Sequence, residues 1–460
     1  MIEELLQDLR ARPDALVFLG RDRITRAEFA DLVWTFAGGL RARNPRNVAL
    51  VARPGPATLA FALAAVGMGV RLDLVDPRGG TELVQGRLEA AVPDVVVAEP
   101  WLRFALKGPG WLRRPLGLPD WRIWPEVVAI DDVGGAQVRR FALTPEQSAL
   151  CVFTSGTTDD PTGVVHSLAS LDAGFGMVAS LFDAHAEGPV VADTFFAMLP
   201  AIALGLPVLR PASRPAALAK QLRRWRPSHT YLTPPRWRAL LAAGGTVTGR
   251  TFAGSAPVTA ELLGRLRGAG ASEAWGVYAM TEVFPVAAVE SSNKDADDPL
   301  GDHAGRLFDG VEARVEGDEL ILAGTSMAPR RVDGSWVDEV PTGDLAHLDG
   351  RELWLRGRTK DMILQGATNI YPGLYEPRLT LDGVDVALLL GIPGEDADER
   401  LVLLAQPTGA PGDLERRLIR RARELGLRLD AVVLDEVPTS GRSDKPDRAA
   451  ARALVQERLA

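Results

Sequence analysis

The stretch from Asn47 to Val75 reads NVALVARPGPATLAFALAAVGMGVRLDLV. Residues 47–52 are mostly apolar and predict a buried strand, residues 57–67 predict a helix, and residues 70–75 predict a second strand. A strand, a helix and a strand in this order form a β-α-β unit, in which the strands are parallel and the helix covers the sheet. The stretch therefore predicts an α/β fold with a parallel sheet.

The same alternation continues along the chain. It predicts a strand at residues 94–98, a second series of strands at 189–191, 206–209 and 230–232, and a helix at 215–225. Ser213 suits the N-cap of that helix, and Pro215 suits its first turn. We expect two stacked, mostly parallel sheets with helices on their faces.

From Gly310 onward the pattern changes to short strands separated by turn residues. Residues 311–315 and 319–322 alternate in this way and predict a small β subdomain at about residues 305–356. This subdomain would complete a large N-terminal domain at residues 1–356.

The last hundred residues are predicted to form a separate domain. Strands near residues 385–391 and 401–406 and an amphipathic helix at 413–425 predict a small α+β domain. We place it at residues 357–460.

Composition excludes several classes of protein. The 460 residues are 46% hydrophobic and 24% charged, which is typical of a globular chain with two or three cores. No apolar run of about 18 residues occurs and the first residues are acidic, so we expect neither a membrane span nor an export signal. Cys151 is the single cysteine and the five histidines are scattered, which favours a reducing, cytoplasmic location without zinc. The net charge of −8 argues against nucleic acid as a partner.

Residues 101–124 are both aromatic and basic. Such a segment could lie at a membrane surface, with its aromatic rings among lipid headgroups. The alternative is an insertion that folds over its own protein, with arginine stems covering the tryptophans. We favour the second interpretation and do not expect peripheral membrane contact.

A loop rich in hydroxyl groups follows the apolar residues 149–153. It consists of Thr154, Ser155, Gly156, Thr157 and Thr158. Hydroxyl and backbone N–H donors around a glycine can wrap phosphate oxygens. No Gly-Lys-Ser/Thr follows at the spacing of a Walker loop. The loop thus indicates a phosphate site of another kind.

Three further motifs follow this loop in a recognisable order. They are Gly276–Glu282 (GVYAMTE), Thr342–Leu345 (TGDL) and Gly357–Ile363 (GRTKDMI) with Asn369–Pro372 (NIYP). Together with the loop they resemble the adenylate-forming superfamily of acyl-CoA synthetases, fatty-acyl-AMP ligases, luciferases and peptide-synthetase adenylation domains. The resemblance covers nearly the whole chain. It implies an ATP-dependent, AMP-forming ligase of carboxylic acids with a mobile C-terminal domain.

The resemblance assigns a role to individual residues of these motifs. It implies that Tyr278 stacks on adenine, that Thr281 bonds the α-phosphate and that Glu282 holds Mg²⁺. Asp344 would accept both ribose hydroxyls, with Arg358 supporting the same sugar. The loop of Gly254, Ser255 and Ala256 would line the adenine and acyl pocket.

Two lysines complete the set that the resemblance implies. Lys445, in a loop near the C-terminus, would be the catalytic lysine, because a fixed ammonium stabilises charge that accumulates as pyrophosphate leaves. Lys360 occupies the hinge position, about which the C-terminal domain would turn between adenylate formation and acyl transfer.

The chain also departs from the family pattern. Asp159, Asp160 and Thr162 replace neutral residues and a lysine in the phosphate loop, and like charge near a triphosphate weakens ATP binding. Ala279 replaces a glycine, and Leu168 stands where a histidine is common. We expect a slower or narrower enzyme than the family pattern implies.

Several functions stay open within this reading. The motifs are most similar to a fatty-acid branch, so the expected substrate is a fatty acid, with CoA or an acyl carrier protein as acceptor. A β-lactone synthetase, in which the acid's own β-hydroxyl attacks the adenylate, is an alternative. A nucleotide-binding regulator with no catalysis would explain the lost loop lysine but not Lys445. A membrane-surface scaffold explains none of the motifs.

Overall fold

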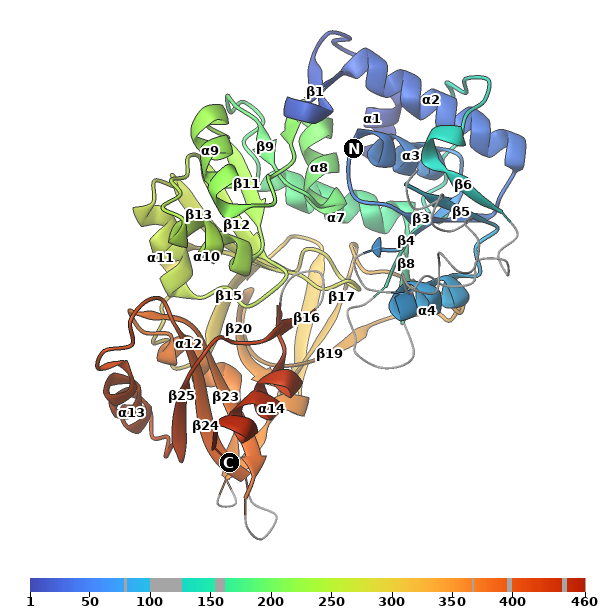
Figure 1. The fold of residues 1–460 in the computed structure, drawn as a ribbon. Helices are drawn as coiled ribbons and strands as arrows, with labels where there is room; N and C mark the ends of the chain where they lie inside the picture. Colours follow the sequence, from blue (N-terminus) through green and yellow to red (C-terminus); the bar gives the residue numbers. More distant parts are fainter. Residues whose placement is uncertain are drawn as a thin grey trace, which may run out of the picture.

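The computed structural model describes residues 1–77, 81–99, 126–153, 162–365, 368–394, 399–440 and 445–459. Figure 1 shows the N-terminal half as layers of helices and strands, with the C-terminal region below it in orange and red. Among these residues, no helix combines the length and the apolar composition needed to span a bilayer.

The first sheet has seven strands within the described part of the chain. In spatial order they are β18 (Arg330–Arg331), β8 (Gly163–Ser167), β7 (Ser148–Phe153), β4 (Arg71–Leu74), β3 (Asn47–Val51), β5 (Val95–Ala98) and β6 (Val127–Ala129). Strands β3 and β4 are parallel and are joined by α3 (Pro56–Gly67), which begins with a proline in its first turn. The β-α-β unit expected at residues 47–75 is confirmed.

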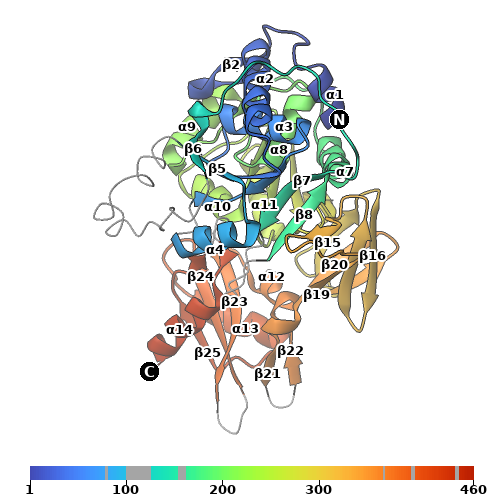
Figure 2. The ribbon, with the colours of Figure 1, turned by 90° about the vertical axis from the view of Figure 1, so that its right-hand side faces the viewer.

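The second sheet has more strands than the first, and its strand pairing changes from parallel to antiparallel across the sheet. Its strands, in spatial order, are β16 (Val311–Glu316), β17 (Glu319–Gly324), β19 (Val340–Asp349), β20 (Glu352–Arg358), β15 (Asp302–Leu307), β14 (Ala287–Glu290), β13 (Glu273–Tyr278), β12 (Arg250–Gly254), β11 (His229–Leu232), β9 (Val190–Val191), β10 (Val208–Leu209), β1 (Leu16–Phe18) and β2 (Ile24–Thr25). The part from β9 to β13 is parallel, whereas β14 to β20 pair antiparallel. The expected β subdomain therefore continues this sheet, and Figure 2 shows its strands beside β7 and β8.

Helices cover both sheets and meet in a shared core. They are α1 (Ile2–Gln7), α2 (Arg26–Arg43), α3, α4 (Thr81–Ala91), α7 (Leu168–Ser180), α8 (Phe195–Ala203), α9 (Pro215–Trp225), α10 (Pro234–Ala242) and α11 (Ala260–Gly268). Phe61 of α3, Phe175 of α7 and Met198 of α8 belong to one buried cluster with strands of both sheets. This apolar layer is what fixes one sheet against the other.

The start of α9 corrects one expectation. The helix has the predicted bounds, and Pro215 occupies its first position. Its N-cap, however, is Arg214, which makes no side-chain capping bond. Ser213 lies one residue too early because the proline ring, whose fixed φ suits the first helical position, sets where the helix begins.

The C-terminal region has its own sheet and cores. Strands β23 (Val384–Pro393), β24 (Glu399–Pro407) and β25 (Ala431–Leu434) form the sheet. Helices α12 (Glu376–Leu379) and α13 (Leu414–Glu424) pack on one of its faces, and α14 (Arg448–Leu459) packs on the other. Two short hairpins accompany it: β21 (Ile363–Gln365) with β22 (Thr368–Ile370), and β26 (Thr439–Ser440) with β27 (Lys445–Pro446).

The join between the two regions follows β20. This strand continues to Arg358, where it pairs with Asp344 of β19, and a short turn at Thr359–Asp361 comes next. We propose that the domain boundary lies at this turn, a few residues beyond the position expected at residue 356.

Candidate active site

Three side chains from strands β13, β19 and β20 of the second sheet form a hydrogen-bonded unit. The Tyr278 hydroxyl donates to Asp344 Oδ2 over 2.6 Å, and Arg358 Nε donates to Asp344 Oδ1 over 2.7 Å. The Asp344 side chain is 9% exposed, whereas that of Arg358 is 49% exposed. Burial, followed by the charge of Asp344, raises the pKa of Tyr278 well above its usual value. The phenol therefore stays neutral and acts as a donor to an ionised carboxylate.

The residues after Tyr278 leave the strand and form an irregular segment. Within it, Met280 N–H donates to the Val283 carbonyl at 3.1 Å, and Ala328 N–H donates to the Glu282 carbonyl at 2.8 Å. Thr281 and Glu282 are half-buried. The segment thus presents a hydroxyl and a carboxylate next to the end of β13.

Glu282 has the properties of a metal ligand. Burial raises its pKa, and the positive charges of Arg358 and Arg331 oppose this shift. A carboxylate that has lost hydration gains from an ion of opposite charge, and Mg²⁺ prefers carboxylate and phosphate oxygens. The described residues contain no group of three His, Cys, Asp or Glu side chains that could hold a metal by itself.

Lys445 comes to the same place from the other domain. It lies in β27, and its ammonium interacts electrostatically with Arg358, Asp344 and Glu282. The residue as a whole is exposed, but partial desolvation of its ammonium lowers its pKa, assisted by the charge of Arg358 and opposed by the two carboxylates. Lys445 therefore lies within electrostatic range of two carboxylates, each more than a hundred residues before it in the sequence.

The loop after β12 lies beside this unit. Gly254 pairs with Val277 of β13, and Ser255 accepts or donates a 2.8 Å hydrogen bond with the Tyr231 hydroxyl. Ser255 has φ of +67°, a left-handed conformation that costs a residue with a side chain on the order of 1 kcal/mol or more. Ala256 follows it and is half-buried.

Part of the expected site lies outside the described residues. Thr154, Ser155, Gly156, Thr157 and Thr158 belong to this part, as do Asp159 and Asp160. The strands on either side, β7 and β8, are antiparallel, and Phe153 faces Gly163 where the loop begins and ends. The aromatic segment at 101–124 also lies outside. The roles assigned to these residues stay predictions.

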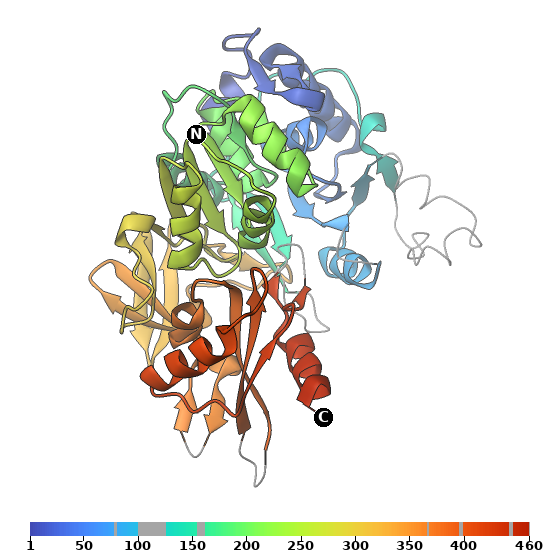
Figure 3. The ribbon, with the colours of Figure 1, turned by 60° about the vertical axis from the view of Figure 1, so that its left-hand side comes forward.

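Ion pairs connect the C-terminal region to the larger domain. The Asp385 Oδ1 atom of β23 lies 3.4 Å from Arg238 Nε of α10 and 3.3 Å from Arg265 Nη1 of α11. Asp297, which precedes β15, contacts Arg378 and Arg421 of the C-terminal region. Figure 3 shows this region lying against the helices of the larger domain. Lys360 lies in the turn between the domains.

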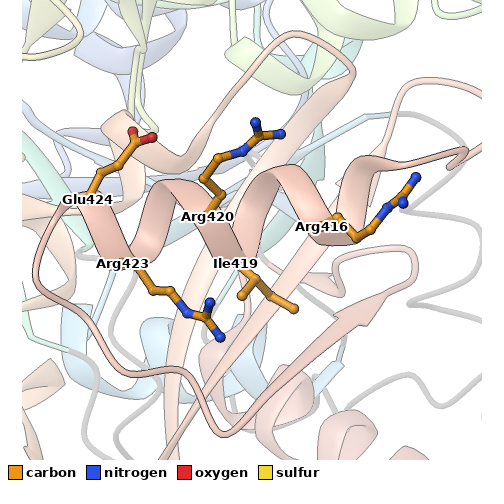
Figure 4. A pocket seen from close by; sticks show the side chains of 5 residues that line it. All are labelled: Arg416, Ile419, Arg420, Arg423 and Glu424. Atoms are coloured by element: carbon orange, nitrogen blue, oxygen red, sulfur yellow. The ribbon is translucent and has the colours of Figure 1, made fainter.

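A shallow hollow elsewhere on the surface contains none of these residues. Figure 4 shows its lining, which comes from α13 alone: Arg416, Ile419, Arg420, Arg423 and Glu424. It belongs to the outer helix of the C-terminal domain. The site described above is therefore distinct from it.

One residue of the site did not stand out in the sequence. His166 is completely buried in β8, and its Nε2 atom donates to the Thr281 carbonyl at 2.9 Å. In the family pattern a histidine is common at position 168, two residues later, where this chain has leucine. In the sequence, the feature that could have identified His166 is a histidine within an apolar strand directly after the predicted phosphate loop.

Comparison with known proteins identifies the family of the chain. A family model described as "AMP-binding enzyme" matches residues 6–324. The chain therefore belongs to the AMP-binding enzyme family, and its resemblance to adenylate-forming enzymes is confirmed.

The match to individual relatives is limited in sequence identity and in coverage. The chain is 32% identical over 113 residues to a putative long chain fatty acid-CoA ligase (VraA) of Staphylococcus epidermidis, which is 22% of this chain and 24% of that protein. It is 28% identical over 326 residues to an olefin β-lactone synthetase of Stenotrophomonas maltophilia, which is 66% of this chain and 55% of that protein. The matches thus span less than two thirds of either relative.

A solved structure extends the likeness to the whole fold. The amide bond synthetase McbA of Marinactinospora thermotolerans superposes with a TM-score of 0.81, covers 98% of this chain and 99% of its own, and is 18% identical. At this identity the likeness concerns the fold alone. It confirms the α/β architecture with a large N-terminal and a small C-terminal domain.

Proposed function

We propose that this enzyme is an ATP-dependent, AMP-forming ligase that activates a carboxylic acid, in the first place a fatty acid. The observation that carries the proposal is the electrostatic interaction of Lys445, from the C-terminal region, with Asp344, Arg358 and Glu282. A site that only bound a nucleotide would need the tyrosine and the ribose-binding carboxylate. It would not need a partly desolvated ammonium contributed by a second domain.

The proposed reaction has one chemical step before acyl transfer. A carboxylate oxygen of the acid forms a bond to the α-phosphorus of ATP. The bond between that phosphorus and the oxygen bridging to the β-phosphate breaks, and pyrophosphate leaves with the electron pair. Negative charge accumulates on both sides of the phosphorus, so fixed cations accelerate the step.

Each residue of the site has a part in this step. Tyr278 offers its ring to adenine, and Asp344, oriented by the donors of Tyr278 and Arg358, accepts from the ribose hydroxyls. Thr281 would donate to the α-phosphate, and Glu282 would hold Mg²⁺, which neutralises phosphate charge when bound. Lys445 would stabilise the charge on the oxygens that exchange partners.

Acyl transfer would follow a rotation of the C-terminal domain about the turn that contains Lys360. Lys445 would leave the site, and CoA or an acyl carrier protein would take the acyl group. A second candidate is β-lactone formation, in which the β-hydroxyl of the acid attacks its own adenylate. The match to a β-lactone synthetase over 326 residues favours this candidate.

The test is pyrophosphate release with ATP, Mg²⁺ and a panel of short, long, aromatic and β-hydroxy acids, without and then with CoA. The ligase function predicts release that depends on one class of acid and is lost in Lys445→Ala but not in Lys220→Ala, an exposed lysine of α9. Release without CoA, accompanied by a lactone, would identify the second candidate. Binding of ATP with no release for any acid would contradict both.

A further inference from the structure

His166 connects two parts of the site through a buried hydrogen bond. It lies in β8, the strand that follows the phosphate loop, and it is fully buried. Its Nε2 atom is 2.9 Å from the Thr281 carbonyl oxygen, and its Nδ1 atom is 3.2 Å from the Ser170 hydroxyl of α7. The imidazole therefore joins β8, α7 and the segment after β13.

The chemistry of the partners fixes the role of each ring nitrogen. A carbonyl oxygen only accepts, so Nε2 carries the proton and donates to Thr281. In the neutral ring Nδ1 is then an acceptor, and its neighbouring donor is the Ser170 hydroxyl, which is also 3.2 Å from the Ser167 carbonyl. Complete burial lowers the pKa of His166 to about 4, so the ring stays neutral at physiological pH.

The segment that receives this bond is irregular. It forms neither helix nor strand, and its backbone is held by the Val283 and Ala328 bonds described above and by a 2.9 Å bond from the Val286 N–H to the Tyr278 carbonyl. Among the described residues, His166 is the side chain that hydrogen-bonds to the Thr281 carbonyl. Phe284 packs edge-on against the imidazole, with ring centroids 5.1 Å apart, and so limits its rotation.

We propose that His166 is a positioning residue for adenylate formation. By holding the Thr281 carbonyl, it fixes the direction in which the Thr281 hydroxyl and the Glu282 carboxylate face the nucleotide. This inference rests on the roles proposed above for these two residues. The same hydrogen bond would hold β8, which follows the predicted phosphate loop in sequence, in a fixed position relative to the segment after β13.

The test compares two substitutions of His166 whose side-chain amides extend to different distances from the backbone. Gln at this position places its amide nitrogen near the Nε2 position and keeps a donor to Thr281. Asn reaches only the Nδ1 position and loses that donor. In acid-dependent exchange of pyrophosphate into ATP, His166→Asn should lower kcat by roughly 10- to 100-fold, since small misplacements in an active site cost up to this much. His166→Gln should stay within about threefold of wild type, and KM for ATP should change less than kcat in both.

A matched control separates positioning from stability. His229 of β11 is equally buried, and it hydrogen-bonds to the Asp183 amide and Ser228 outside the proposed site. His229→Asn should lower the midpoint of thermal unfolding yet keep kcat when assayed well below that midpoint. Equal kcat losses in His166→Asn and His166→Gln, or an equal loss in His229→Asn, would overturn the inference.

Two further outcomes are distinguishable. If His166→Asn does not fold, Ser170→Ala removes the donor to Nδ1 and should lower kcat by about three- to tenfold, because the ring is less well oriented; an unchanged kcat would overturn the inference. If wild type itself shows no acid-dependent exchange, the proposed function fails first, and the inference fails with it.

Discussion

The Asp385 carboxylate should determine how often the C-terminal domain holds Lys445 at the site. One of its oxygens faces both Arg238 and Arg265 of the larger domain. The side chains of Arg238 and Asp385 are only 11% and 15% exposed, so this contact is largely removed from water. Asp385→Asn keeps the shape of the side chain and removes its charge.

The expected magnitude follows from this burial. Removing one partner of a fully buried ion pair costs about 3–5 kcal/mol, because the other charge stays buried and unpaired. Here Arg265 keeps Glu261 at 3.3 Å, and both partners retain some exposure. We therefore expect the smaller cost of about 2 kcal/mol, which corresponds to a domain arrangement roughly 30-fold less populated.

The assay is pyrophosphate exchange into ATP with the acid identified above. Asp385→Asn should lower the exchange rate by about 3- to 30-fold and raise the apparent KM for ATP, since only the competent fraction binds productively. The wild-type rate should fall only weakly with rising salt, because salt screens buried pairs less than exposed ones. Asp382→Asn, an exposed carboxylate three residues earlier, is the matched control. A wild-type rate in Asp385→Asn would refute this account of the domain contact.

Three further predictions concern the site and its surroundings. Lys445→Ala should slow adenylate formation by about 100-fold or more while ATP affinity changes less than about threefold, measured by single-turnover kinetics and by titration; a wild-type rate would remove Lys445 from the mechanism. Asp344→Asn should weaken ATP binding by about tenfold or more in the same titration, because it removes the charge that the donors share, and Tyr278→Phe should do so less, because Arg358 still orients the Asp344 carboxylate. Burial lowers the pKa of His229 to about 4, so protonation favours the unfolded chain, and stability present above pH 6.5 is lost as the pH falls toward 4. Between pH 7 and 5 wild type should lose about 2 kcal/mol more than His229→Gln in urea unfolding, whereas the exposed His185→Gln should follow wild type.

The fold was predictable where apolar runs alone decide burial. All five residues of β3 are buried, so their pattern has one interpretation. The bounds of α9 were also correct, because Pro215 begins the helix and Arg226, with φ of +42°, ends it. The last strand of the β subdomain, β20, continues two residues past the expected boundary at residue 356 because Arg358 pairs with Asp344, a contact that local pattern does not contain.

The site was predictable as a set of motifs but not as an arrangement. Resemblance identified Tyr278, Asp344 and Lys445 from short motifs. The hydrogen bond between Tyr278 and Asp344 joins residues 66 positions apart, and the contact between Asp385 and Arg265 joins residues 120 apart. Such contacts depend on how the sheets and domains pack, so composition and spacing do not predict them. The importance of His166 likewise emerges only once Thr281 is seen beside it.

The most direct test of the central claim follows oxygen from the acid. The acid is supplied with ¹⁸O in both carboxylate positions, together with ATP, Mg²⁺ and the acceptor, and the AMP produced is analysed by mass spectrometry. If a carboxylate oxygen attacks the α-phosphorus, AMP should carry one ¹⁸O atom after acyl transfer. AMP without ¹⁸O, or ADP in its place, would contradict adenylate formation.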